Sequence, residues 1–353
     1  MSDVAKWVRG PVQTLRSEFA TWDLERQEWK FDRPVTEATF RPDGAILSSD
    51  TYNPDGSIAH SRFLSDDAGR VSETGSWMND GPVSKVRYFY DETGRPTRTA
   101  RLNEDGTQTD LEVWTYDVRG RKSKLRCLAP RAPGSECNAG TCIANVSYAI
   151  EGTDSSYGAS GASTLTIDYD EHDRPVKVSF HDADHRLLSH VLFRRDSTGK
   201  LLSEERHEGE TGLFQEHLNN TPPERRAQLA AMLKQVFSEG LSATRYSYDE
   251  QGRLITRESR LGTLGGTRST YRYNDRNDHI EQTTEHRSCE GGLDEAGNVQ
   301  YSSEKTNIQH NRLEYLYDAH GNWTEKMVSY RLESGSEFRR SSMQRRIITY
   351  YAM

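Results

Sequence analysis

Aspartate and arginine recur along the chain at one fixed spacing, and a carboxylate beside a guanidinium could serve as a pair of catalytic groups. Each copy begins with Tyr-Asp, continues with two variable residues and usually closes with Gly-Arg. Five copies show the pattern most clearly: Tyr90-Asp91-Glu92-Thr93-Gly94-Arg95, Tyr116-Asp117-Val118-Arg119-Gly120-Arg121, Tyr169-Asp170-Glu171-His172-Asp173-Arg174, Tyr248-Asp249-Glu250-Gln251-Gly252-Arg253 and Tyr317-Asp318-Ala319-His320-Gly321-Asn322. Because a repeat gives these residues the same position in every copy, we interpret them as scaffold and not as catalytic residues.

Other patterns that could carry chemistry are weak. The densest histidine group is His172, His181, His185 and His190, but two of them flank a turn and would not share a strand face, so surface histidines are favoured over a metal site. The serine pairs lack a Gly-x-Ser-x-Gly elbow. The glycine-rich run at residues 262–266 follows no strand–helix signal and is interpreted as a hairpin loop, not a phosphate cradle. We therefore expect no catalytic, cofactor or metal residues and a protein that is not an enzyme.

The four cysteines leave two disulfides possible. Cys127, Cys137 and Cys142 fall in a loop rich in proline and glycine, and Cys289 stands apart from them. Three connectivities are possible, and the residues favour disulfides over free thiols or a zinc site, for which the spacing is irregular. Disulfides would indicate an oxidising compartment. We therefore expect an extracytoplasmic location (periplasmic, cell surface or secreted) if a signal peptide was removed, and a cytoplasmic one otherwise.

The repeated motif itself predicts a β-hairpin. Aspartate at the first turn position can accept backbone N–H groups two residues on, and glycine near the end of the turn can adopt a positive φ. Alternating polar and apolar runs flank each turn, as in Arg253-Leu254-Ile255-Thr256. The pattern fits a type I turn closed by a glycine bulge, repeated roughly every dozen residues in some stretches and every 25 in others.

On this motif the chain resembles the YD-repeat, or RHS-repeat, family. The resemblance implies a mainly β fold, in which antiparallel hairpins form a sheet that coils into a β-solenoid-like spiral or a partial shell. Large members of that family enclose a C-terminal toxin, whereas this chain has no Asp-Pro dipeptide of the associated cleavage region and no recognisable toxin after its last repeat. The resemblance therefore implies the fold and not the delivery activity.

Composition agrees with a thin sheet. Only 33% of the residues are hydrophobic, the net charge is −8, and the mean hydropathy is −0.89. An acidic chain with interspersed arginine argues against nucleic acid as a partner. No run approaches the ~20 apolar residues of a transmembrane helix, so no membrane span is expected.

Two inserts and a terminal segment interrupt the repeats. We expect residues 1–35 to form an irregular or short helical N-terminal cap and residues 36–353 to form the repeat sheet. Within the sheet, residues 126–163 form a loop insert rich in cysteine, glycine and serine. Residues 221–240 form an amphipathic helix that begins at a capping box. Its apolar stripe would pack on the sheet or plug a coiled shell; a partner-docking face is the alternative.

These observations favour a non-enzymatic scaffold, extracytoplasmic or at the cell surface, that binds a carbohydrate or another protein across its sheet. The exposed aromatic residues Trp77, Trp114 and Trp323 are the binding candidates, with strand core as their other possible role. The alternative function is a small shell or chaperone that encloses a separately encoded toxin or other polypeptide. A hydrolase on this scaffold has the least support.

Overall fold

The structure is a computed structural model that describes residues 8–128, 148–149, 156–157, 162–209, 218, 221–237, 240–293, 299–332 and 337–352. It divides into two compact units. Unit 1 contains Met1–Thr109, Tyr273–Glu281 and His310–Met353, and unit 2 contains Asp110–Arg272 and Gln282–Gln309. No helix within the described ranges is long and apolar enough to cross a membrane.

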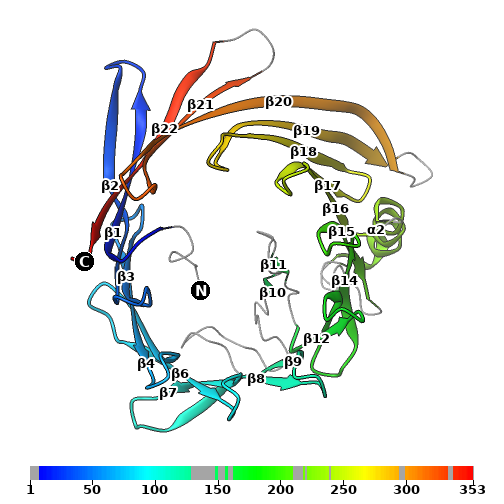
Figure 1. The fold of residues 1–353 in the computed structure, drawn as a ribbon. Helices are drawn as coiled ribbons and strands as arrows, with labels where there is room; N and C mark the ends of the chain where they lie inside the picture. The colour runs from blue at the N-terminus through cyan, green and yellow to red at the C-terminus, as the bar shows by residue number, and fades with distance from the viewer. Residues whose placement is uncertain are drawn as a thin grey trace. The chain divides into compact units, whose positions relative to one another are not determined.

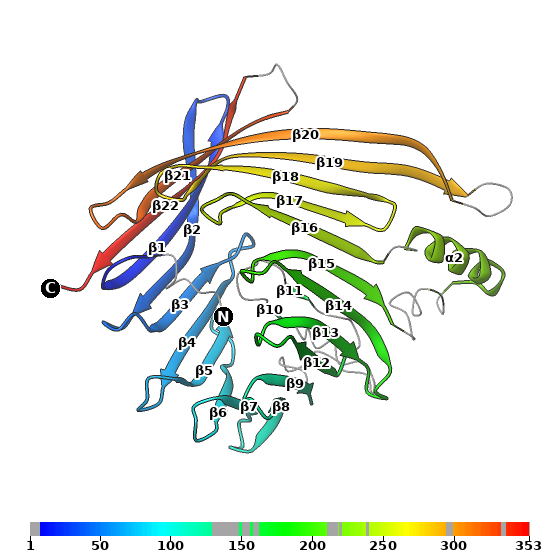
Figure 2. The ribbon, with the colours of Figure 1, turned by 45° about the vertical axis from the view of Figure 1, so that its right-hand side comes forward.

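Antiparallel strands make up most of both units. The strands of the N-terminal part are β1 (Val12–Asp23), β2 (Glu28–Phe40), β3 (Ile46–Tyr52), β4 (Ile58–Ser65), β5 (Val71–Met78), β6 (Ser84–Tyr90), β7 (Pro96–Leu102), β8 (Gln108–Tyr116) and β9 (Lys122–Cys127). Those that follow are β10 (Tyr148–Ala149), β11 (Ser156–Tyr157), β12 (Thr164–Tyr169), β13 (Pro175–His181), β14 (Leu187–Arg195), β15 (Leu201–Glu208), β16 (Ser242–Tyr248), β17 (Leu254–Leu261), β18 (Gly265–Tyr273), β19 (His279–Leu293), β20 (Val299–Tyr317), β21 (Trp323–Leu332) and β22 (Arg339–Tyr350). Helix α2 (Pro223–Val236) lies between β15 and β16 in the chain (Figure 2).

The repeated motif forms the hairpin turn that its sequence predicts. In the first clear copy, Asp91 Oδ1 accepts the backbone N–H groups of Thr93 and Arg95, both at 2.9 Å. Asp91 Oδ2 accepts Arg95 Nε at 2.7 Å. Gly94 donates its N–H to the Asp91 carbonyl and has a φ of 85°, which favours glycine. Aspartate and arginine are thus parts of the turn.

The tyrosine of the motif connects one repeat to an earlier one. The Tyr90 hydroxyl donates to the carbonyl of Val71 at 2.7 Å, and the guanidinium of Arg70 lies 4.5 Å from the centre of its ring. Tyr169 makes the same two contacts with Lys122 and Arg121. A cation just before one strand and a tyrosine at the end of the next strand of the sheet therefore form a recurring inter-repeat contact.

The first and last strands of the sheet are paired with each other, and this corrects the expected fold class. All described strands except β10 and β11 belong to one 20-stranded sheet. In unit 1, β1 pairs with β2 on one side and with β22 on the other, from Val12↔Tyr350 to Thr21↔Ser342 (Figure 1). A spiral, solenoid or partial shell would leave its end strands unpaired. The order of pairing is a closed ladder instead, so the spiral and shell predictions are wrong.

The functions that we inferred from an open sheet or a shell are withdrawn with that fold. These are the YD-repeat scaffold that binds carbohydrate or protein and the shell that encloses a toxin. The expectation of no membrane span is withdrawn too. It considered only apolar runs of helical length, and the chain consists mainly of strands whose pairing order closes.

Two local predictions also need correction. The segment expected to be an irregular or helical cap contains β1 and part of β2, and the proposed boundary at residue 36 falls inside β2. A helix does form within residues 221–240, but its N-cap is Pro222 and makes no side-chain capping bond, so the predicted capping box is absent. Leu229, Met232 and Leu233 are half-buried and Val236 is buried, while most other α2 residues are exposed.

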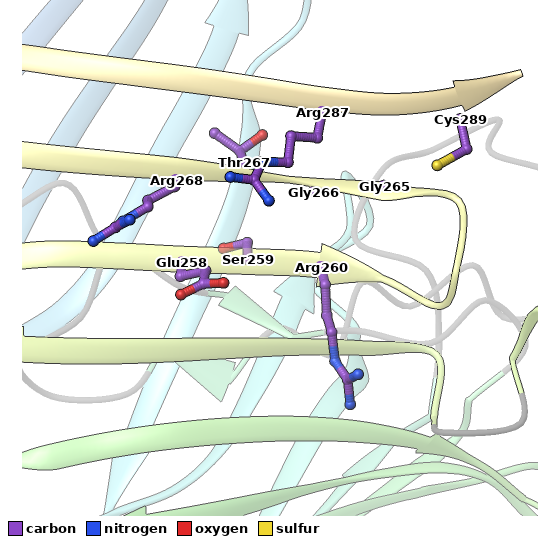
Figure 3. Close-up of a pocket in the computed structure, with 9 residues that line it drawn as sticks. All are labelled: Glu258, Ser259, Arg260, Gly265, Gly266, Thr267, Arg268, Arg287 and Cys289. Atoms are coloured by element: carbon purple, nitrogen blue, oxygen red, sulfur yellow. The ribbon is translucent and has the colours of Figure 1, made fainter. Parts of the chain in front are cut away.

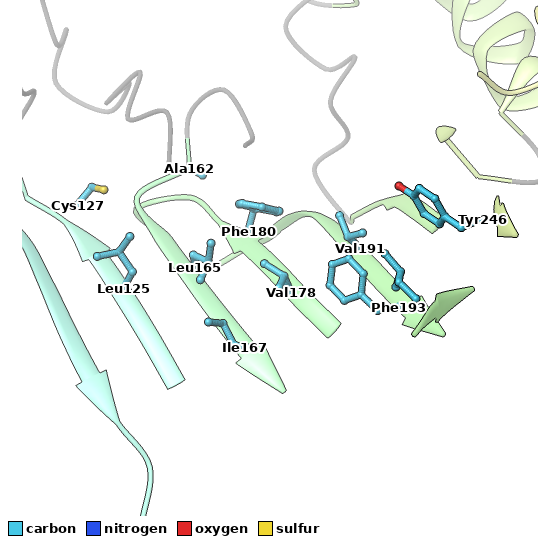
Figure 4. Close-up of a cluster of buried hydrophobic side chains, with 11 residues drawn as sticks. Leu125, Cys127, Ala162, Leu165, Ile167, Val178, Phe180, Val191, Phe193 and Tyr246 are labelled. Atoms are coloured by element: carbon cyan, nitrogen blue, oxygen red, sulfur yellow. The ribbon is translucent and has the colours of Figure 1, made fainter. Parts of the chain in front are cut away.

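A core lies on one side of the strands in unit 2. Phe180, Val178 and Val191 are fully buried, and residues from β9, β12 and β16 join them (Figure 4). A smaller buried cluster in unit 1 contains Val12, Leu15, Ala38 and Phe40. Each unit therefore has buried apolar side chains of its own.

Candidate functional site

A hollow of about 350 Å³ lies beside the β17–β18 hairpin in unit 2. Three strands line it, and its charged residues are Glu258, Arg260, Arg268 and Arg287 (Figure 3). Cys289 and the glycine pair Gly265 and Gly266 complete the wall, with Ser259 and Thr267. We call this hollow the Gly266 cavity. Its size is at the lower end of the range for small-molecule sites.

Strand register sets which side chains share a face of the sheet. Arg260 pairs with Gly266, and Glu258 pairs with Arg268. On the other side of β18, Thr267 Oγ1 lies 3.2 Å from His286 Nδ1. The Cys289 N–H donates to the Leu264 carbonyl at 2.9 Å. These two contacts fix the register between β18 and β19, and in that register Gly266 lies opposite Arg287. Since successive side chains alternate between the faces of a sheet, Thr267 and His286 lie on the other face.

Two charge patterns follow on that face. Arg268 lies between acidic neighbours, because Glu258 is its partner on β17 and Glu285 faces it from β19. Gly266 instead lies between Arg260 and Arg287. Figure 3 shows Arg287 reaching from β19 to β18, whereas Arg260 extends from β17 away from Gly266, toward β16. Arg287 Nε also donates to Glu285 Oε1 at 2.7 Å.

Glycine is needed at this point of the sheet. A Cβ on Gly265 would lie 2.2 Å from the Arg287 carbonyl oxygen, and one on Gly266 would lie 2.4 Å from the Ser259 carbonyl oxygen. Real Cβ atoms do not approach backbone this closely, so both positions exclude larger residues. Because neither glycine has a side chain, a space remains above β18 between Arg260 on β17 and Arg287 on β19.

A second hollow of about 390 Å³ shares this hairpin. Its wall includes residues that alternate with those of the first face: Ser259, Leu261, Thr267, His286 and Ser288. Ser259 Oγ lies 3.2 Å from Thr244 Oγ1, and Thr267 contacts His286. Hydroxyl and imidazole groups therefore lie on the opposite face of the same hairpin.

Helix α2 is attached to the tip of this hairpin. The Thr263 N–H donates to the Val236 carbonyl at 3.0 Å, and the Gly262 N–H donates to Leu241 at 3.1 Å. A Cβ on Gly262 would lie 2.4 Å from the Val236 oxygen. The C-terminal end of α2 therefore holds the loop that precedes the Gly266 cavity.

The glycine-rich run at residues 262–266 is a hairpin loop, as predicted, and it also borders a cavity, which was not predicted. The sequence signal that could have indicated the cavity is the pair Gly265-Gly266, with Arg260 before it and Arg268 after it. The contribution of Arg287 could not be read from that segment, because it depends on pairing with β19.

The three tryptophans predicted as binding residues each contact side chains of their own unit. Trp77 stacks on His60, with ring centres 4.9 Å apart. Trp114 packs against the core of unit 2, and Arg346 lies 3.4 Å from the ring centre of Trp323. Burial lowers the pKa of Arg346 to about 10. These rings are half-buried strand contacts.

The predicted histidine group and cysteine bridges have separate outcomes. His190 stacks on His207, with ring centres 5.2 Å apart. In the described part of the chain, no group of three His, Cys, Asp or Glu residues could hold a metal ion. Cys127 lies in the core of unit 2, and Cys289 has no disulfide partner among the described residues. Cys137 and Cys142 lie outside those residues, so the disulfide pairing stays a prediction.

Comparison with known proteins finds likenesses among solved structures only. No protein-family model and no curated protein matches the chain. Among solved structures, a porin-like protein from Bacteroides uniformis is 9% identical, with a TM-score of 0.30 over 97% of this chain and 99% of that one. A putative outer membrane lipoprotein-sorting protein domain from Vibrio parahaemolyticus is 11% identical, with a TM-score of 0.15 over 57% of this chain and 81% of that one. Likenesses this low carry no conclusion about fold or function, and the YD-repeat resemblance rests on the motif alone.

Proposed function

We propose that this protein binds a small anionic ligand in the Gly266 cavity. The observation that carries the proposal is the position of Gly266 between Arg260 and Arg287 on the two flanking strands. The glycine leaves space where neighbouring positions carry side chains. An anion there could contact the Arg287 guanidinium, which reaches toward β18, and Arg260 would contact it after a change of rotamer.

The chemistry of the wall supports an anion over a cation. Three arginines and one glutamate line the cavity, and Glu258 is the direct partner of Arg268. Arginine presents five N–H donors in a planar fork, so one guanidinium can serve more than one acceptor. Because Arg287 Nε donates to Glu285, a ligand would share Arg287 with that carboxylate.

Two further expectations remain proposals. We propose that binding involves no catalysis, which the role of the repeated Asp and Arg residues in turn structure supports. We also propose an extracytoplasmic location, supported by the cysteines of the insert at residues 126–163. Thiol alkylation followed by mass spectrometry of the non-reduced protein tests this location, and four reactive thiols would contradict it.

Calorimetric titration of acetate, succinate, sulfate and inorganic phosphate at low ionic strength tests the anion proposal. We expect at least one anion to bind, and we expect Arg260→Gln and Arg287→Gln each to weaken that binding about tenfold or more, because a charged hydrogen bond contributes roughly 1.5 to 3 kcal/mol.

Arg245→Gln is the matched control. Arg245 is on β16, pairs with Glu258 and is exposed, so its loss should leave the affinity within about twofold while it changes the net charge equally. The proposal is wrong if no anion binds, or if the control weakens binding as much as the cavity variants.

A further inference from the structure

We infer that the turn between β20 and β21 acts as a latch that keeps β1 paired with β22. The turn comprises residues 318–322 and binds residues 8–11, which we call the strap. β1 and β22 lie side by side in unit 1 (Figure 1), and we call their pairing the seam. Where a hairpin turn joins two strands, the chain itself keeps them close. At the seam, 335 residues separate the paired Thr14 and Thr349, so other contacts must hold it.

The side chain of Asn322 connects the latch to the strap. Asn322 is only 3% exposed. Its Oδ1 accepts the N–H of Arg9, and its Nδ2 donates to the Arg9 carbonyl at 2.8 Å. The same Nδ2 donates to the Tyr350 hydroxyl at 2.8 Å. One buried amide, with its acceptor and both donors used, therefore binds the strap and the last residue of β22.

The backbone of the strap extends the seam beyond β1. The Tyr351 N–H donates to the Pro11 carbonyl at 2.8 Å, and the Val12 N–H donates to the Gly10 carbonyl at 2.9 Å. Gly10 has a φ of 87°, and a Cβ there would lie 3.3 Å from Nδ1 of His320 in the latch. The strap thus lies against both the latch and the residue that follows β22.

The latch departs from the repeated motif at the residue that makes these contacts. In the first clear copy the motif ends with Arg95, whose Nε donates to Asp91 Oδ2 at 2.7 Å. The last copy ends with Asn322, and there Asp318 Oδ2 accepts the Tyr350 hydroxyl instead. The Asn322 N–H still donates to Asp318 Oδ1 at 2.9 Å. The backbone of the turn therefore forms without the amide group, which is left to bind the strap.

Loss of the latch should separate the seam without unfolding the rest of unit 1. A local opening needs less free energy than global unfolding where few contacts cross the edge that opens. Both strands keep their other partners, since β1 still pairs with β2 and β22 with β21. The latch therefore sets how often the seam opens while the protein stays folded.

Asn322→Arg tests this role, because it gives the last turn the arginine of the motif and removes the amide. We measure hydrogen exchange of the full chain by mass spectrometry. The seam-facing amides in peptides covering residues 12–21 and 342–350 should exchange about tenfold or more faster, since the hydrogen bonds of the amide to the strap and to Tyr350 are lost. Residues 84–102, which form β6 and β7 of the same unit, should change by less than about twofold.

Gly10→Ala approaches the same contact from the strap. Its Cβ would meet His320 and its backbone would be strained, so the same peptides should exchange faster. Gly106→Ala is the matched control for strain alone. Gly106 has a φ of 81° and no atom within 4 Å of its Cβ position, so this variant should leave exchange at the seam within about twofold.

Three results would overturn the inference. The first is unchanged seam exchange in Asn322→Arg and Gly10→Ala. The second is an equal acceleration in residues 84–102, which would assign the effect to global destabilisation. The third is a Gly106→Ala variant that accelerates the seam as much as Gly10→Ala. If Asn322→Arg does not fold, the comparison of Gly10→Ala with Gly106→Ala decides alone.

Discussion

Single residues at the ends of the hairpin turns show what the repeat requires and where it tolerates exceptions. The fifth motif position is glycine in most clear copies, with a φ of 85° at Gly94 and 82° at Gly252. Asp173, His185 and Asn277 occupy the matching place in other turns, with φ of 63°, 65° and 68°. A left-handed conformation costs a residue with a Cβ roughly 1 to 2 kcal/mol.

His185 is the exception most open to improvement. We expect His185→Gly to raise the free energy of unfolding by about 0.5 to 1 kcal/mol, since it removes backbone strain but adds freedom to the unfolded chain. Gly44→Ala is the matched opposite change. Gly44 has a φ of 84°, and no atom lies within 4 Å of the point where a Cβ would lie. The substitution should therefore lower the free energy of unfolding by about 1 kcal/mol through backbone strain alone. Urea unfolding measures the free energy of unfolding of both variants. A lower value for His185→Gly than for the unsubstituted protein would refute this account of the turn.

The same change should not help at Asp173. Its carboxylate accepts Arg119 Nη1 and Arg121 Nη1, both at 2.6 Å. These contacts connect the β12–β13 turn to the β8–β9 turn in unit 2. Aspartate at this position has a strained backbone, but its carboxylate binds two arginines of the neighbouring hairpin. This contact explains why the motif has aspartate and not glycine in this copy.

At the scale of elements, α2 and the β17–β18 hairpin depend on one another. We expect Gly262→Ala to destabilise the protein by about 1 to 3 kcal/mol, because its Cβ would lie 2.4 Å from the Val236 oxygen and 2.8 Å from the Phe237 ring. Hydrogen exchange should show lost protection at the Gly262 and Thr263 amides and along the last turn of α2.

Gly106→Ala controls for backbone strain in this experiment. Gly106 has a φ of 81° and open space around its Cβ position, so the substitution should leave exchange in α2 unchanged. Equal loss of α2 protection in both variants would mean that the helix responds to general destabilisation and not to its contact with the hairpin.

The sequence predicts elements better than it predicts their partners. The turns follow from local chemistry, since Asp91 and Gly94 make their defining contacts within five residues. The β1–β22 pairing has no turn signal, because its strands come from opposite ends of the chain. The cavity was missed for the same reason: Arg260 and Gly266 are close in sequence, but the position of Arg287 depends on the register of β19.

At the scale of the whole molecule, half-buried histidines predict a stability that depends on pH. Burial is the first cause that lowers the pKa of His181, His190 and His279. Nδ1 of both His181 and His190 is buried without a hydrogen-bond partner among the described residues. Since the folded pKa lies below the unfolded one, the unfolded chain binds more protons between these values.

The free energy of unfolding should therefore be highest above the unfolded pKa of about 6.5 and should decline as the pH falls below it. Urea titrations between pH 5 and pH 8 measure the slope. His190→Gln should flatten it, whereas His172→Gln should not, because His172 is an exposed turn residue. A slope that is unchanged in His190→Gln would assign the pH effect to other groups.

Carboxylates contribute in a separate acid range. Hydrogen bonds from the turn backbone lower the pKa of Asp117, Asp170 and Asp249. Their contribution is present above the unfolded pKa of about 3.9 and is lost as the pH falls through the folded values. Acid unfolding should therefore proceed in two pH ranges, with histidines acting first.

The pairing of β1 with β22 has a consequence for the time course of synthesis. Thr14 and Thr349 touch through their hydroxyl oxygens across 335 residues of chain. A ribosome makes β1 before the other strands of the sheet, and the strand that covers its second edge, β22, follows only after more than 300 further residues. Until then that edge can pair with any other exposed strand, including one on a neighbouring nascent chain. The period of greatest exposure to aggregation is thus set by how long translation takes to reach β22.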